Sequence, residues 1–124
     1  MTVFLDLEDA LRIGEAVLGA APQVRDLGMI ESAIARPRTS LFGEDAYLSV
    51  HEKAAAMLQS LVKNHGLVDG NKRLGFACTA VFLHVNGAPL TMTDDGPAYD
   101  LVMAVATGEL QEVGEIATAL EGGS

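Results

Sequence analysis

The stretch over 49–85, SVHEKAAAMLQSLVKNHGLVDGNKRLGFACTAVFLHV, determines the fold of this chain. It opens with Ser49 and Glu52, the spacing of a capping box, in which a serine hydroxyl and a glutamate carboxylate satisfy the first amides of a helix. Apolar residues then recur at spacings of three and four as far as His65, and again over 71–85. The pattern predicts two amphipathic helices that pack together as the core pair, with His65 on the inward face of the last turn of the first.

Weaker signals on both sides of this pair predict further helices. Asp6 is a candidate N-cap for the first of them, and glycine or proline follows the apolar runs where helices should stop. The expected elements are helices over 6–18, 27–35, about 93–106 (with 93–95 as caps) and 110–120, and a loop or short hairpin over 37–48. The chain is therefore predicted to be all-α, a single domain over 1–124 with one irregular insertion.

Length and composition exclude several classes of protein. At 124 residues and 49% hydrophobic, with a mean hydropathy of +0.27, the chain is predicted to fold as one soluble domain. No apolar run approaches the roughly 18 residues of a membrane span, and the N-terminus carries acids where a signal peptide carries cations. We expect a cytoplasmic protein. The single cysteine, Cys78, excludes an internal disulfide and a cysteine-based zinc site.

The charge distribution points to one place in the chain. The net charge of −9 argues against broad nucleic-acid binding, which depends on neutralising phosphates with lysine and arginine. All eight basic residues lie at or before Arg73, and the rest of the chain carries only acids. Positive charge therefore ends at Lys72 and Arg73, where the second core helix begins.

The nine residues HGLVDGNKR, which begin at His65, combine the groups needed for phosphoryl chemistry. Asn71, Lys72 and Arg73 fall on the first turn of a helix, where unpaired amides and the helix dipole already favour an anion. Asp69, just before that turn, would repel a bare phosphate but suits a divalent metal that phosphates share. Histidine titrates near neutral pH, so His65 is a candidate to take a proton from a hydroxyl. The set predicts phosphoryl or nucleotidyl transfer.

HGLVDGNKR resembles the motif of the Fic/Doc superfamily, whose usual form is HPFxxGNGRxxR, and is closer to the Doc branch, the toxins of Phd-Doc toxin–antitoxin modules. The stretch VRDLGMIESAIARP, the apolar helix after NKR and the late ATGE also have counterparts in that branch. The resemblance implies a Fic-type helical bundle. It also implies that 37–48 is a flap, which in the family holds the backbone of the target by strand-like pairing.

Two departures from the usual motif indicate the reaction. Lys72 stands where Fic adenylyltransferases have a second glycine, and Phe76 stands where they have a second arginine. In the Doc branch the first change accompanies ATP bound in the reversed sense, with the γ-phosphate facing the target. The resemblance thus implies a kinase that phosphorylates a threonine of elongation factor Tu and halts translation. Adenylylation of a target hydroxyl is the alternative.

The resemblance implies a role for each matching position. His65 is expected to be the general base, Asp69 the ligand of Mg²⁺ or an orienting acid, and Lys72 a catalytic cation on the transferred or neighbouring phosphate of ATP. Asn71 and Arg73 are expected to bind phosphate, and Gly70 to permit a close approach of the loop. Lys63 occupies a position where a basic residue can orient the target.

Regulation is expected to come from another chain. Many Fic proteins carry an inhibitory helix of the form [S/T]xxxE[G/N], but the only Glu-Gly here is Glu121-Gly122, and Ala117 stands where the pattern requires serine or threonine. In the Phd-Doc family the inhibitor is an antitoxin, whose disordered C-terminal segment folds as a helix into a groove of the toxin. A Phd-like antitoxin is therefore the expected partner.

The same residues allow other interpretations. His65 alone could be an ordinary interior histidine, and Arg36 and Arg38 beside the insertion could bind a partner or simply be solvated. A DNA-binding helix-turn-helix would use the same helix pair, but the helix after Arg73 is too apolar for a groove. A phosphohydrolase of the HD type lacks its His-Asp pair, and a P-loop enzyme lacks GxxxxGK[ST].

Overall fold

The computed structural model describes residues 1–92 and 96–122, and within them the predicted all-α class is confirmed. The elements are α1 (Leu7–Leu18), α2 (Leu27–Ala35), η1 (Arg36–Arg38), β1 (Ser40–Leu41), β2 (Glu44–Asp45), α3 (Val50–Lys63), α4 (Asn71–Val85), α5 (Pro97–Thr107) and α6 (Val113–Leu120). The hairpin falls within the predicted insertion, and α2 has the predicted bounds. The caps expected at 93–95 lie outside the described residues.

Local hydrogen bonds explain where the first helices begin. The side chain of Asp6 accepts a hydrogen bond from the amide of Asp9 at 2.8 Å, and the hydroxyl of Ser49 accepts one from the amide of Glu52 at 3.0 Å. In both places the N3 carboxylate accepts in return from the N-cap amide, so α1 and α3 each begin with a complete capping box. Each of these hydrogen bonds joins two residues that are three positions apart in the sequence, which is why the sequence could indicate them.

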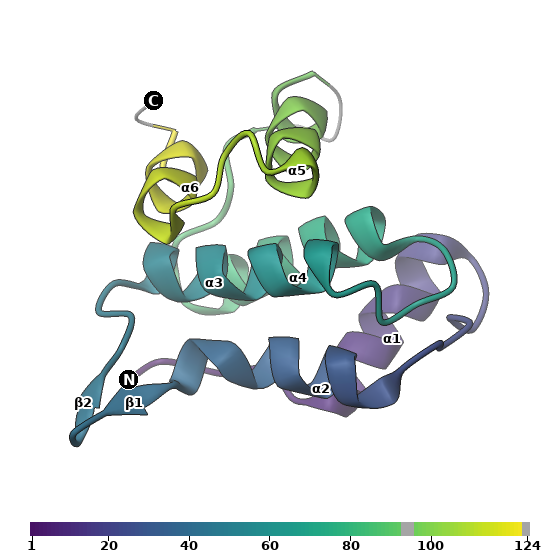
Figure 1. The fold of residues 1–124 in the computed structure, drawn as a ribbon, viewed down its shortest axis with the longest axis horizontal. Helices are drawn as coiled ribbons and strands as arrows, with labels where there is room; N and C mark the ends of the chain where they lie inside the picture. The colour runs from purple at the N-terminus through teal and green to yellow at the C-terminus, as the bar shows by residue number, and fades with distance from the viewer. Residues whose placement is uncertain (93–95, 123–124) are drawn as a thin grey trace.

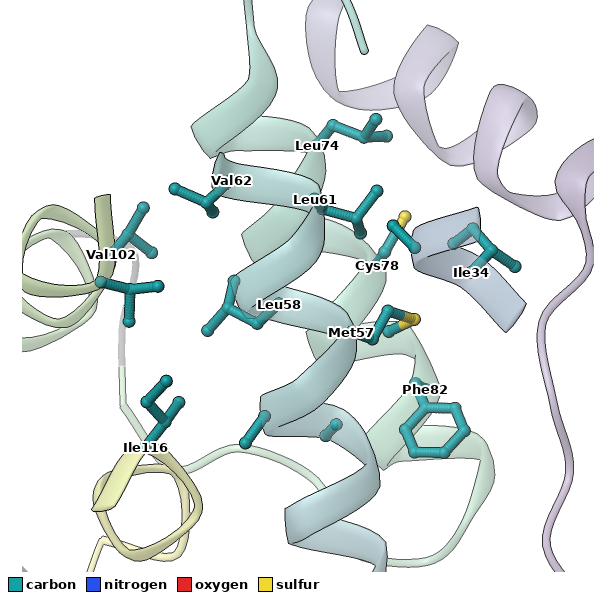
Figure 2. Packing of buried hydrophobic residues seen from close by; sticks show 14 of the residues in the cluster. Ile34, Met57, Leu58, Leu61, Val62, Leu74, Cys78, Phe82, Val102 and Ile116 are labelled. Atoms are coloured by element: carbon teal, nitrogen blue, oxygen red, sulfur yellow. The ribbon is translucent and has the colours of Figure 1, made fainter. Parts of the chain in front are cut away.

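The helices form three layers with the predicted core pair in the middle. Figure 1 shows α3 beside α4, with α1 and α2 on one side of them and α5 and α6 on the other. Figure 2 shows the core that results, in which α3 and α4 contribute the central side chains and the outer layers close both flanks. The labelled residues are Met57, Leu58, Leu61 and Val62 of α3, Leu74, Cys78 and Phe82 of α4, Ile34 of α2, Val102 of α5 and Ile116 of α6.

The α3–α4 contact is close because Gly75 faces α3. A Cβ atom at this position would lie 2.9 Å from Cγ2 of Val62 and 3.3 Å from Cδ1 of Leu58, both buried side chains. Cys78, one turn further along α4, is fully buried, and desolvation by burial raises the pKa of its thiol to about 12. The thiol is therefore a core group and carries no charge near neutral pH.

One part of the predicted inward face of α4 is open. Val85 is exposed, and Ala77 and Val81 are only half-buried. The reason is that Ala77 and Val81 face a cleft between α4 and α5. None of the helices that the structure describes is long and apolar enough to cross a membrane.

Gly75→Ala is expected to destabilise the protein. The added methyl group overlaps Val62, and overpacking a core typically costs 1–3 kcal/mol, which exceeds the gain of roughly 1 kcal/mol from replacing a helical glycine. Gly114→Ala is the matched control, because no atom lies within 4 Å of a Cβ there and α6 should gain stability. Urea denaturation should give opposite signs for the two variants. Equal signs would contradict the close-packing argument.

Candidate active site

A cleft of about 1,040 Å³ brings most of the predicted site residues together. One part is polar and is formed by the α3–α4 loop and the first turn of α4. The other part is apolar and runs between α4 and α5. The lining includes His65, Asp69, Gly70, Asn71, Lys72 and Arg73 from the first part and Phe76, Ala77, Ala80, Val81, Ala98, Tyr99, Val102 and Met103 from the second. Lys63, in the last turn of α3, is exposed and does not line this cleft.

His65 is not on the inward face of a helix, so that prediction was wrong. Helix α3 ends at Lys63, and His65 follows in the left-handed conformation, with φ of 53°, exposed and lining the cleft. Gly66 accounts for the early end of the helix, because a Cβ there would lie 2.5 Å from Cγ1 of Ile30 in α2. The chain must turn at His65 to bring Gly66 against α2, and histidine is among the residues enriched in this conformation.

The loop after α3 is held by the segment that precedes α2. The amides of Arg25 and Asp26 donate to the carbonyl of Gly66 at 2.8 and 2.9 Å, and the amide of Val68 donates to the carbonyl of Gln23 at 2.9 Å. Leu67 forms an isolated bridge with residue 24 of the same segment and is buried. Residues about 40 positions upstream therefore set the shape of the loop, which sequence reasoning missed. The sequence signal that could have indicated this contact is Arg25, in the stretch VRDLG.

Helix α4 begins without a side-chain cap. Its N-cap is Gly70, with φ of 91°, and a Cβ there would lie 2.8 Å from Cδ2 of Leu18. The Gly70 amide donates to Oδ1 of Asp69 at 2.9 Å, which turns that carboxylate back on the loop. The first-turn amides of α4 and the positive end of its dipole are thus left to solvent or to a ligand.

The side chains on that first turn have different surroundings. Oδ1 of Asn71 accepts from the amide of Leu67 at 2.9 Å, and Nδ2 of Asn71 donates to the carbonyl of Leu67 at 3.1 Å. Nη2 of Arg73 donates to the carbonyl of Val17 in α1 at 2.6 Å. Lys72 is exposed, and within the described residues no hydrogen bond or ion pair to it occurs. Asn71 therefore closes the loop, and Lys72 is the first-turn cation without a protein partner there.

The carboxylate in the cleft has the chemistry of a ligand for a metal whose other ligands are water and phosphate oxygens. Residues 1–92 and 96–122 contain no group of three or more histidine, cysteine, aspartate and glutamate side chains that could form a metal cage. Asp69 is the carboxylate that lines the cleft. Mg²⁺ commonly uses one or two protein carboxylates, with water and substrate phosphates as the other ligands. Asp69 fits that donor set.

The predicted hairpin lies at the opposite end of α3 from His65 (Figure 1). Helix α3 has 14 residues, which corresponds to a separation of about 21 Å along its axis. Buried Lys53 holds the base of the hairpin, since its Nζ donates to Oδ2 of Asp45 at 3.2 Å and to the carbonyl of Tyr47 at 2.5 Å. The segment is anchored away from the cleft.

The two arginines beside the hairpin bind within the protein. The guanidinium of Arg36 donates to the hydroxyl of Tyr47 at 3.0 Å and to the carbonyl of Ala56 at 2.9 Å. That of Arg38 donates to the carbonyl of Leu5 at 2.9 Å and lies over the ring of Phe4. Both side chains tie this region to α3 or to the N-terminus.

Comparison with known proteins defines the class. Residues 4–83 match the model described as the Fic/DOC family, and the chain belongs to this family. It is also similar to a protein named Toxin Doc from Mycolicibacterium smegmatis, with 46% identity over 123 residues that cover 98% of this chain and 94% of that protein. The resemblance stated from the motif is thereby confirmed, and the matched residues include the whole of HGLVDGNKR.

Asn71→Ala is expected to lower the free energy of unfolding by about 1–3 kcal/mol, because it leaves the amide and carbonyl of buried Leu67 without their partner. Asn64→Ala is the control. In the described part of the chain the Asn64 side chain makes no hydrogen bond, and only its main-chain amide and carbonyl do. Chemical denaturation of both variants measures the difference. A loss of the same size in both would show that Asn71 does not hold the loop.

Proposed function

We propose that the protein is the toxin of a toxin–antitoxin module and transfers the γ-phosphate of ATP to a threonine hydroxyl of elongation factor Tu. Membership of the Fic/DOC family and the similarity to Toxin Doc support the broader class, a toxin that is a transferase-type enzyme. One observation carries the finer proposal. His65 and the uncapped start of α4, with Lys72, line the same cleft.

In this proposal the start of α4 binds the phosphates. The amides of the first turn and the ammonium group of Lys72 stabilise the negative charge that develops on the transferred group. Mg²⁺, held by Asp69 and the phosphates, would supply further charge neutralisation when bound. His65 takes the proton of the threonine hydroxyl as the threonine oxygen forms a bond to the γ-phosphorus. The bond between that phosphorus and the bridging oxygen of ATP breaks, and ADP leaves.

The residues beside the phosphate-binding turn favour a kinase over an adenylyltransferase. Lys72 stands where the usual motif has a glycine, and a long side chain there hinders a close approach of the pyrophosphate to the backbone. Phe76, which replaces the second arginine, lines the cleft half-buried and supplies no charge for a further phosphate. These two side chains suit ATP bound with its γ-phosphate toward His65.

The expected antitoxin requires an apolar surface, and the part of the cleft between α4 and α5 offers one. Its accessible lining includes half-buried Ala80 and Val81 of α4 and exposed Tyr99 and half-buried Met103 of α5, which lie about two turns of α4 or one helix away from Arg73. A helix bound there would bury these side chains and restrict access to the phosphate-binding turn. We place the C-terminal segment of a Phd-like antitoxin on this surface.

Labelled ATP distinguishes the two reactions. The purified protein, incubated with elongation factor Tu, Mg²⁺ and ATP labelled separately at the α and γ positions, is expected to transfer only the γ label. Mass spectrometry of the target should then find a phosphorylated threonine. Transfer of the α label would establish adenylylation instead. Transfer of neither label would contradict the proposed activity.

His65→Ala is expected to abolish growth inhibition in cells and to lower the rate of label transfer by about 10²–10⁴-fold, the usual contribution of a general base. The side chain is exposed, so the fold should be retained, which circular dichroism checks. His84→Ala is the control, because His84 is also exposed but lies in the last turn of α4 outside the cleft. Undiminished toxicity of the His65 variant would remove His65 from its assigned role.

A further inference from the structure

Arg25, which no motif of the sequence assigned to the site, reaches the end of α3 with its side chain. Its Nε donates to the carbonyl of His65 at 2.8 Å, and its Nη2 donates to the carbonyl of Asn64 at 3.4 Å. The last carbonyls of a helix lack partners within the helix and carry its partial negative charge, so a cation is favoured there. Arg25 thus binds the carbonyl of Asn64, the C-cap of α3, and the next carbonyl of the loop. It does so from the segment that precedes α2, which lies beside the α3–α4 loop in Figure 1.

The same residue holds the peptide groups on both sides of the turn at His65. Its guanidinium binds the carbonyls of Asn64 and His65, which belong to the peptide groups before and after His65, and its main-chain amide donates to the carbonyl of Gly66 at 2.8 Å. His65 has φ of 53°, a conformation that costs free energy for a residue with a side chain, so the contacts that hold its backbone matter. The backbone angles at His65 also fix the direction in which its Cβ leaves the chain, and hence where the imidazole can lie.

We propose that Arg25 is a positioning residue, whose guanidinium fixes the left-handed backbone of His65 and so keeps the imidazole in the cleft for proton transfer. The role in catalysis rests on the proposed function, whereas the effect on the His65 backbone does not. Arg25 does not line the cleft. It acts through His65.

The start of α4 is held separately, which makes the proposal specific. Asn71 binds both polar main-chain atoms of Leu67, and these bonds do not involve Arg25. Loss of the guanidinium therefore releases His65 and leaves the phosphate-binding turn in place. Loss of the Arg25 guanidinium should therefore lower kcat and leave the KM for ATP nearly unchanged.

Arg25→Gln removes the guanidinium and keeps the main-chain amide that binds Gly66. We expect kcat for transfer of the γ label to fall by about 10- to 100-fold, the scale of a small misplacement of a reacting group, with the KM for ATP within about twofold of the parent. Arg25→Lys retains a cation and a donor and should recover part of the loss. Arg12→Gln removes an equal charge from an exposed pair with Glu8 and should change neither constant.

A second measurement does not depend on activity. The three-bond coupling between the amide and Hα protons of His65 reports its φ angle in solution. It should change in Arg25→Gln, return toward the parent value in Arg25→Lys and stay constant in Arg12→Gln. If the parent protein transfers neither label, the proposed function fails, and this coupling still decides whether Arg25 holds His65.

Two outcomes would overturn the proposal. One is an Arg25→Gln variant with the kcat of the parent and an unchanged His65 coupling. The other is a variant in which kcat falls and the KM for ATP rises together while the His65 coupling is unchanged, since that pattern belongs to a general structural defect. Should Arg25→Gln fail to fold, Arg25→Lys provides the same comparison with a smaller change.

Discussion

The site depends on the docking of the α3–α4 loop against the segment before α2. Main-chain hydrogen bonds from Arg25 and Asp26 to Gly66, and from Val68 to Gln23, join two parts of the chain that lie about 40 residues apart in the sequence. They hold the loop in place after α3, whose end is set by the contact of Gly66 with Ile30. Without this docking the loop would have no fixed shape, because its glycines permit many backbone conformations.

The sequence predicted those features that depend on neighbouring residues. The capping box at Ser49 and Glu52 predicted the start of α3, and the glycine that follows the apolar run over 71–85 predicted the end of α4. The end of α3 was predicted two residues too late, because the apolar spacing continues to His65 and only the contact of Gly66 with Ile30 makes the chain turn earlier. That contact is tertiary, so no local pattern could indicate it.

The cleft was predicted only in its polar part. The motif brought His65 and the first turn of α4 together because they are adjacent in the sequence. The apolar wall includes residues of α5, whose packing against α4 is a tertiary feature that the sequence did not show. Ala77 and Val81 were therefore predicted to face the core, although they line the cleft. A half-buried apolar residue and a core residue have the same periodicity, so the sequence cannot separate them.

The distribution of positive charge has a different explanation from the one that the sequence suggested. Of the cations that precede Leu74, Arg25, Arg36, Arg38 and Arg73 donate to main-chain carbonyls, and Lys53 is buried under the hairpin. Most of this charge stabilises helix ends and loop contacts. What remains for an anion in the cleft is Lys72 and the uncapped start of α4, which together suit a short phosphate chain rather than an extended polyanion. The net charge of −9 reinforces that distinction, because a phosphate chain as long as a nucleic acid would be repelled by the protein as a whole.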